Sequence, residues 1–185
     1  MTPIEEILEL FARHGDSEYG GEAVTQLEHG LQAATLAEQE DAAPDLIVAA
    51  LLHDIGHLLH DLPVDAPEQG IDDHHETAGM NYLKNKFPAS VTEPIRMHVA
   101  AKRYLCAAEP GYSQTLSEPS VVSLNLQGGQ MSLDEMQEFE QSPFWKEAVS
   151  LRRWDDAAKD PDLKTPPLEH FAKYMTLVVR GAGDP

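Results

Sequence analysis

Cysteine is almost absent from this sequence of 185 residues, which contains only Cys106. An intrachain disulfide is therefore excluded, and nothing indicates folding in an oxidising compartment. The chain also lacks an apolar run near the ~18 residues that span a bilayer, and its first residues lack the basic and apolar regions of a signal peptide. We expect a cytoplasmic protein without membrane contact.

Basic residues are also scarce. Lysine and arginine together number 13, against 32 aspartate and glutamate residues, which gives a net charge of −19. This charge repels nucleic acids and anionic membranes over a Debye length of ~8 Å, so we expect no nucleic-acid partner. A small anionic substrate remains compatible with the charge, because metal ions buried in a pocket dominate the field inside it.

The remaining composition is typical of a folded protein. Apolar residues make up 42%, and the 12 glycines and 13 prolines are scattered along the chain. The length is sufficient for one good core, so we expect a single domain over residues 1–185.

The apolar pattern has helical spacing and shows no strand signal, which predicts an all-α fold. Thr92 and Pro94 are expected to open one helix, and Asp72 or Asp73 to cap another. A helix from Pro44 should end before Gly56 and a loop at Pro63. The predicted helices cover residues 22–38, 44–55, 74–85, 92–105, 133–139, 144–154 and 168–179, with a partly helical excursion over 107–130.

Histidines fall in or beside the most apolar of these helices. His53 and Asp54 directly follow the run Ala49–Ala50–Leu51–Leu52. A buried carboxylate without partners costs several kcal/mol, so Asp54 needs either a metal ion or strong hydrogen bonds such as a plain His–Asp pair. His57 comes one helical turn after His53 and should point into the same cavity. The other histidines in this group are His29, His74 or His75, and His98.

The residues His29, His53–Asp54 and a carboxylate far downstream resemble the metal-binding pattern of the HD-domain superfamily, most members of which are phosphohydrolases. His75 and His98 would supply further ligands, enough for a second metal ion. Imidazole and carboxylate together suit iron and other borderline metals, and the two oxygens of Asp54 could bridge two ions.

The sequence is most similar to the mixed-valent diiron oxygenases of this superfamily that cleave the carbon–phosphorus bond of 1-hydroxyphosphonates. The resemblance extends from Tyr19 to about His170. It rests on Gln26–Leu27–Glu28–His29, Leu51–Leu52–His53–Asp54–Ile55–Gly56–His57, His98–Val99–Ala100–Ala101–Lys102–Arg103–Tyr104–Leu105, Gln127–Gly128–Gly129 and Trp154–Asp155.

This resemblance implies an HD-domain helical bundle with two iron ions, Fe(II) and Fe(III), and O2 as co-substrate. One ion would be held by His29, His53, Asp54 and Asp155, and the other by Asp54, His75 and His98. His74 and Asp156 are the neighbours that could take the place of His75 and Asp155.

The resemblance also implies which residues meet the substrate. His57 and Lys102 would act as catalytic residues, contacting the phosphonate together with Ser120, with Gln26 close by. Tyr19 and Glu22 would form a lid that senses the ammonium group of the substrate. From its sequence context alone, without the resemblance, Lys102 would be interpreted as a solvated surface lysine. We interpret the arginines as structural or surface residues: Arg103, Arg152 and Arg153.

The implied reaction is oxidative cleavage of a small zwitterionic hydroxyphosphonate. A trimethylammonium group on C2 would give glycine betaine and phosphate, and a primary amine would give glycine and phosphate. Gly20–Gly21 beside Tyr19 could leave room for three methyl groups, which favours trimethylammonium. The alternatives are a metal-dependent HD phosphohydrolase, in which the metal activates water, and a regulatory HD module that binds a phosphorylated ligand without turning it over.

Overall fold

The computed structural model describes residues 1–60, 62 and 69–180. Over these residues the chain is helical and forms no strand, apart from an isolated bridge between Glu18 and Thr25, so the predicted all-α class is confirmed. The α-helices are α1 (Pro3–His14), α2 (Gln26–Gln39), α3 (Pro44–Leu52), α4 (His75–Leu83), α5 (Ala89–Ala108), α6 (Glu118–Leu126), α7 (Leu133–Glu140), α8 (Trp145–Ala157) and α9 (Leu168–Val178). Two short 3-10 helices are η1 (Ile55–Leu59) and η2 (Tyr112–Gln114).

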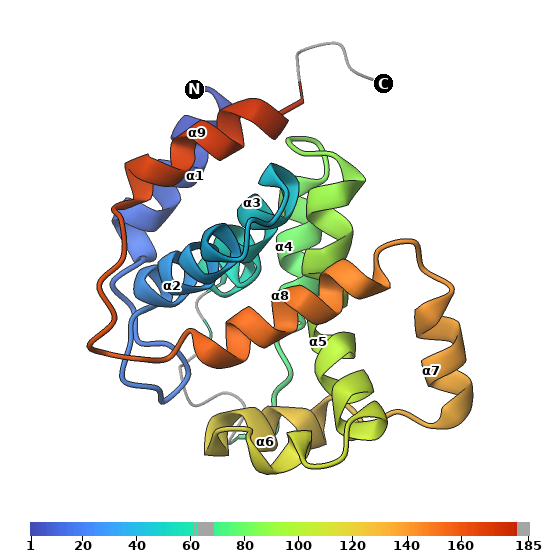
Figure 1. The fold of residues 1–185 in the computed structure, drawn as a ribbon. Coiled ribbons are helices and arrows are strands. Elements are labelled where there is room, and N and C mark those ends of the chain that lie inside the picture. The colour runs from blue at the N-terminus through green and yellow to red at the C-terminus, as the bar shows by residue number, and fades with distance from the viewer. Residues whose placement is uncertain (61, 63–68, 181–185) are drawn as a thin grey trace.

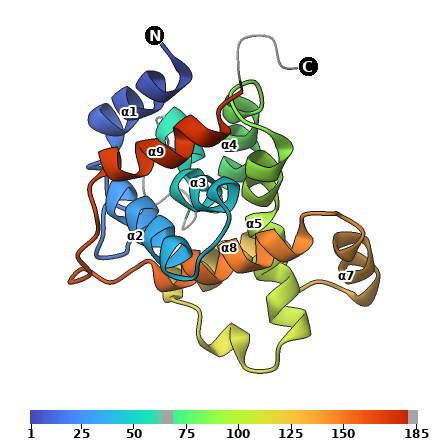
Figure 2. The ribbon, with the colours of Figure 1, turned by 45° about the horizontal axis from the view of Figure 1, so that its top comes forward.

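Helix α3 is the centre of the core. Its residues from Ile47 to Leu52 are all buried, and it packs against α2, α5, α8 and α9. Small residues let α2 come close, and at Gly30 an added Cβ would lie only 2.7 Å from the carbonyl oxygen of Leu51. Helices α1 and α9 lie side by side, and α7 lies far from both, beyond α5 and α8 (Figure 1 and Figure 2).

Helix α1 was not predicted from the sequence, although its signals are local. Thr2 and Glu5 form a capping box, Pro3 occupies the first turn, and Ile7 and Phe11 share one buried face. A second capping box, between Thr25 and Glu28, begins α2 at Gln26. The predicted start at Glu22 was therefore too early.

The predicted boundaries around the histidines need two corrections. Helix α3 ends at Leu52, and His57 lies in η1 instead of one α-helical turn beyond His53. Helix α5 begins at Ala89, so Thr92 and Pro94 lie inside it rather than opening it. Pro94 is in the second turn, where its missing N–H removes only one hydrogen bond, and the helix still runs for its full 20 residues to Ala108.

The capping of α4 also differs in detail from the prediction. His74 is the capping residue, with φ at +49°, and the carboxylate of Asp73 accepts a hydrogen bond from the backbone N–H of His75. The loop predicted at Pro63 lies outside the described residues. None of the described helices is long and apolar enough to cross a bilayer.

Candidate metal centre

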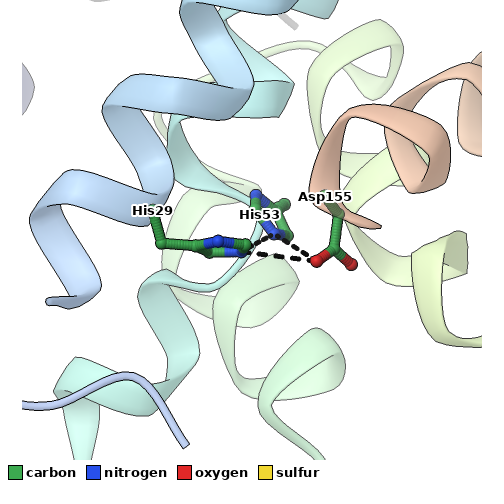
Figure 3. A group of neighbouring side chains, drawn as sticks. All are labelled: His29, His53 and Asp155. Atoms are coloured by element: carbon green, nitrogen blue, oxygen red, sulfur yellow. Dashed lines mark hydrogen bonds and ion pairs between the residues drawn. The ribbon is translucent and has the colours of Figure 1, made fainter. Parts of the chain in front are cut away.

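Six predicted ligands converge from five elements. His29 comes from α2, His53 and Asp54 from the end of α3, and Asp155 from α8, while α4 and α5 bring His75 and His98. The side chains form two buried groups, each able to hold a metal ion: His29, His53 and Asp155; and Asp54, His75 and His98. Figure 3 shows the first group, in which the three side chains point toward one another.

Asp54 joins the two groups. Its Oδ2 lies 3.4 Å from Nε2 of both His29 and His53. Its Oδ1 lies 3.4 Å from Nε2 of His75 and 3.3 Å from Nε2 of His98. One carboxylate oxygen therefore faces each group, which is the placement that a bridging carboxylate requires.

The histidine rings are oriented by their other nitrogen atoms. Nδ1 of His29, His53 and His98 lies 2.7–2.9 Å from the carbonyl oxygens of Ala158, Ala50 and Ile95. Because a carbonyl oxygen only accepts hydrogen bonds, Nδ1 carries a proton, and in a neutral ring that binds a metal ion the Nε2 lone pair would point into the centre. Nδ1 of His75 is held in the same way, 2.8 Å from Oδ1 of Asp73.

This arrangement requires positive charge at its centre. Nε2 of His29 lies 3.0 Å from Nε2 of His53, and Nε2 of His75 lies 3.2 Å from Nε2 of His98. Burial lowers the pKa of His29, but hydrogen bonding to Asp155 and Asp54 outweighs it and raises that pKa to about 9. Oδ1 of Asp54 is buried and accepts no hydrogen bond from the described residues. Four imidazoles and two carboxylates fit a pair of divalent or trivalent ions at this place.

The predicted substrate residues line a cavity of about 930 Å³ beside the metal centre. The ring of His57 stacks on His75 with centroids 4.0 Å apart, and Gln26 and Ser120 lie on the wall, each largely buried. Lys102 is only 2% exposed, and its Nζ donates to Oγ of Ser123 at 2.7 Å. Burial, and next the charge of Arg152, lower the pKa of Lys102 to about 7.

Tyr19 and Glu22 form the part of the wall nearest α2. The Tyr19 ring stacks on His29 with centroids 3.7 Å apart, and its hydroxyl lies 3.4 Å from Oδ1 of Asp155. Glu22 also lines the cavity, where its carboxylate is paired with Lys159. The structure thus brings every residue of the predicted substrate site to one cavity.

The two alternative ligands lie elsewhere. The side chain of His74 is 71% exposed and pairs with Asp72. Asp156 faces away from the histidines and accepts hydrogen bonds from Tyr112 and Arg152. The positions of His75 and Asp155 are therefore the ones that fit the two groups.

Known proteins resemble this chain over nearly its full length. Residues 26–124, more than half of the chain, match the family model of the HD domain. The chain belongs to the HD-domain family.

Two relatives of this HD-domain protein are named for their enzymatic activities. A 1-hydroxy-2-(trimethylamino)ethylphosphonate dioxygenase (glycine-betaine-forming) of Leisingera caerulea is 46% identical over 95% of this chain and 90% of its own length. A hydroxymethylphosphonate dioxygenase of Gimesia maris is 49% identical over 91% of this chain and 84% of its own. An uncharacterised protein of Acanthamoeba polyphaga mimivirus is 39% identical over 93% of this chain and 80% of its own length. These homologues place the HD-domain protein beside phosphonate dioxygenases, as the sequence motifs indicated.

Sequence reasoning missed several residues around the HD centre. Arg152, taken as structural or surface, is buried, lines the cavity and pairs with Asp155 at 2.8 Å. Its spacing of three residues from Asp155 and four from Asp156 was a signal available in the sequence. Asp73, predicted only as a helix cap, also accepts from Nδ1 of His57 and of His75, at 2.6 and 2.8 Å. Lys159 had no local signal, because its partner Glu22 is far away along the chain.

Proposed function

We propose that this protein is a non-haem diiron dioxygenase that cleaves the carbon–phosphorus bond of a 1-hydroxyphosphonate. The observation that carries the proposal is the carboxylate of Asp54, which faces two histidine groups with one oxygen each. The two relatives named as phosphonate dioxygenases support the choice of reaction. Iron, in the mixed-valent Fe(II)/Fe(III) state, and O2 as co-substrate belong to this proposal.

Two iron ions in the proposed centre would supply electron exchange with dioxygen, a template for the substrate oxygens and Lewis acidity. The protein residues hold the substrate and the ligands in place. Lys102, His57 and Ser120 line the cavity where a phosphonate would lie, and the buried ammonium of Lys102 suits its anionic oxygens. Arg152 orients Asp155 through their ion pair.

The overall reaction balances without a further reductant. The substrate loses the carbon–phosphorus bond and its C1 hydrogen, and C1 is oxidised from an alcohol to a carboxylate. Dioxygen is the oxidant, and both of its atoms remain in the products, which are a carboxylate, hydrogen phosphate and a proton. The trimethylammonium compound would give glycine betaine, and the primary amine would give glycine.

The sequence-based preference for the trimethylammonium substrate rested on Gly20–Gly21. Both glycines have positive φ, +45° and +79°. The backbone conformation of the turn is thus sufficient to explain glycine at both positions, and the two glycines do not indicate the size of the substrate group. The two phosphonate dioxygenases have similar identity to this chain but are named for different phosphonates, so the group on C2 has to be inferred from the cavity itself.

The single domain over residues 1–185, the lack of a nucleic-acid partner and the cytoplasmic location stay predictions.

The first experiment uses the iron-loaded, partly reduced protein. We expect oxygen uptake and phosphate release in equal amounts when a 1-hydroxyphosphonate is added. Phosphate release from phosphate esters without oxygen uptake would contradict the proposal and indicate an HD phosphohydrolase. Binding of a phosphorylated ligand with no turnover would indicate a regulatory module.

A further inference from the structure

Lys159 places a positive charge in the wall of the cavity. Its Nζ lies 3.2 Å from Oε1 of Glu22, 2.9 Å from Oγ of Ser120 and 3.2 Å from Oγ of Ser117. The side chains of Lys159 and Glu22 are only 13% and 16% exposed. Lys159 is therefore part of the cavity, whereas most lysines extend into solvent.

The backbone on both sides of Lys159 is fixed. The carbonyl oxygen of Ala158 lies 2.8 Å from Nδ1 of His29. The side-chain amide of Gln32 donates to the carbonyl oxygen of Asp160 at 2.8 Å and accepts from its N–H at 3.1 Å. These contacts tie Lys159 to α2, the helix that carries His29 and Gln26. The backbone of Lys159 is consequently held by a helix that also carries one of the predicted metal ligands.

Lys159 is the counter-charge of Glu22. Oε1 of Glu22 is buried and accepts no directed hydrogen bond from the described residues, so its negative charge is balanced by the ion pair with Lys159. Nζ of Lys159 also lies 5.8 Å from the ring centroid of Tyr19. A positively charged substrate group would need both an acid and an aromatic surface at this place, and Lys159 already faces both.

We propose that Lys159 determines the substrate class by serving as an internal cation. A fixed ammonium beside Glu22 repels a second cation brought by the substrate, and it adds positive charge near Ser120 for the phosphonate dianion. The protein would therefore favour a 1-hydroxyphosphonate that carries no cationic group, of which hydroxymethylphosphonate is the simplest. This inference rests on the proposed function, and with this substrate the balanced products are formate, phosphate and a proton.

The test measures binding separately from turnover. The iron-loaded protein is titrated calorimetrically under argon with hydroxymethylphosphonate and with 1-hydroxy-2-(trimethylamino)ethylphosphonate. We expect the dissociation constant of the trimethylamino compound to exceed that of hydroxymethylphosphonate by at least about tenfold. Lys159→Met should reduce this ratio by about tenfold or more, because it removes the repulsion and frees Glu22.

Two further variants separate the role of the charge from folding. Lys159→Arg keeps a cation and should keep the ratio of the unchanged protein, and it serves if Lys159→Met does not fold. Lys164→Met removes an exposed lysine from the same connecting segment and should also leave the ratio unchanged.

The outcomes distinguish the two proposals. If oxygen uptake occurs but the unchanged protein binds the trimethylamino compound more tightly, or Lys159→Met leaves the ratio unchanged, the role of Lys159 is wrong and the dioxygenase stands. If neither compound binds or drives oxygen uptake, the proposed function fails and the inference fails with it.

Discussion

The buried arginine behind Asp155 illustrates how single residues support the centre. Arg152 pairs with Asp155 through Nη1 at 2.8 Å and contacts Asp156 through Nη2. The charge of Arg152 works against burial and holds the pKa of Asp155 well below its ordinary value. Arg152 therefore orients the predicted metal ligand Asp155 without binding the metal ion itself.

We predict that Arg152→Met weakens iron binding by about 10- to 100-fold, since loss of a partner of a metal ligand has effects of that size. Arg153→Met is the matched control, because Arg153 is its neighbour on α8 but pairs with Glu109 at the surface. Iron content after dialysis against graded chelator concentrations measures the effect. Equal iron retention by both variants would show that Arg152 has no part in holding Asp155.

Gly56 is a further residue that supports the centre, because it allows the backbone of η1 to lie close to the start of α4. A Cβ at Gly56 would lie 2.0 Å from the carbonyl oxygen of His75, so any larger residue must move η1 away from the start of α4. Both Asp54 and His75 belong to the segments that would separate.

Gly56→Ala should destabilise the protein by about 2 kcal/mol or more, in the range of overpacked cores, and lower its iron content. Gly79→Ala is the control, because a Cβ there meets its nearest atom at 3.4 Å and helix α4 favours alanine over glycine. Urea denaturation of both variants, with iron analysis, gives the comparison. A Gly56→Ala protein as stable as Gly79→Ala would refute the close approach.

At the scale of elements, a polar cluster attaches α9 to α2. Glu38 of α2 accepts hydrogen bonds from Tyr174, from His170 at 2.9 Å and from Lys173 at 3.1 Å. The hydrogen bond from Tyr174 is the main cause that lowers the pKa of Glu38 from 4.5 to about 2. The folded state therefore binds a proton at Glu38 less readily than the unfolded state does.

This shift predicts a pH-dependent contribution to stability. Since the pKa of Glu38 is lower in the folded protein, its contribution is present above pH 4.5 and is lost as the pH falls from there through about 2. Glu38→Gln should lower the free energy of unfolding at pH 7 by about 1 kcal/mol, a value kept small by solvent screening. The difference from the unchanged protein should shrink below pH 4.5, and Glu40→Gln, at an exposed position, should show neither effect.

For the whole molecule, the metal ions are expected to act as part of the core. Helices α2, α4, α5 and α8 and the residues directly after α3 contribute to the two groups of ligands, whose metal-binding atoms face one another. A ligand that binds only the folded state stabilises it by about 2.7 kcal/mol when its concentration is 100 times its dissociation constant.

Removal of the proposed iron ions should consequently lower Tm by about 5 to 10 °C, as a protein of this size shifts ~2–4 °C per kcal/mol. Calorimetry of the chelated and iron-reloaded protein under argon provides the measurement. In the Asp54→Asn variant, which lacks the bridging charge, reloading should restore less of this shift. An unchanged Tm on chelation would mean that no metal ion is bound at this centre.

The sequence by itself determined the residue types of the centre and the class of the fold. Apolar spacing predicted most helices, and the ionisable pair His53–Asp54 directly after an apolar helix indicated a metal site, because burial of an unpartnered carboxylate is costly. The prediction missed α1 and misplaced the start of α2 because their capping boxes were overlooked. It misplaced the start of α5 because Pro94 was taken as the beginning of the helix.

Only the tertiary structure decided how these residues meet. It separated Asp155 from Asp156, which share a helix and a residue type, by pointing one toward the histidines and the other toward Tyr112. It also paired Glu22 with Lys159, which are far apart in the sequence. Local spacing fixes which face of a helix a side chain occupies, but the partner on that face comes from another segment, and only packing brings the two together.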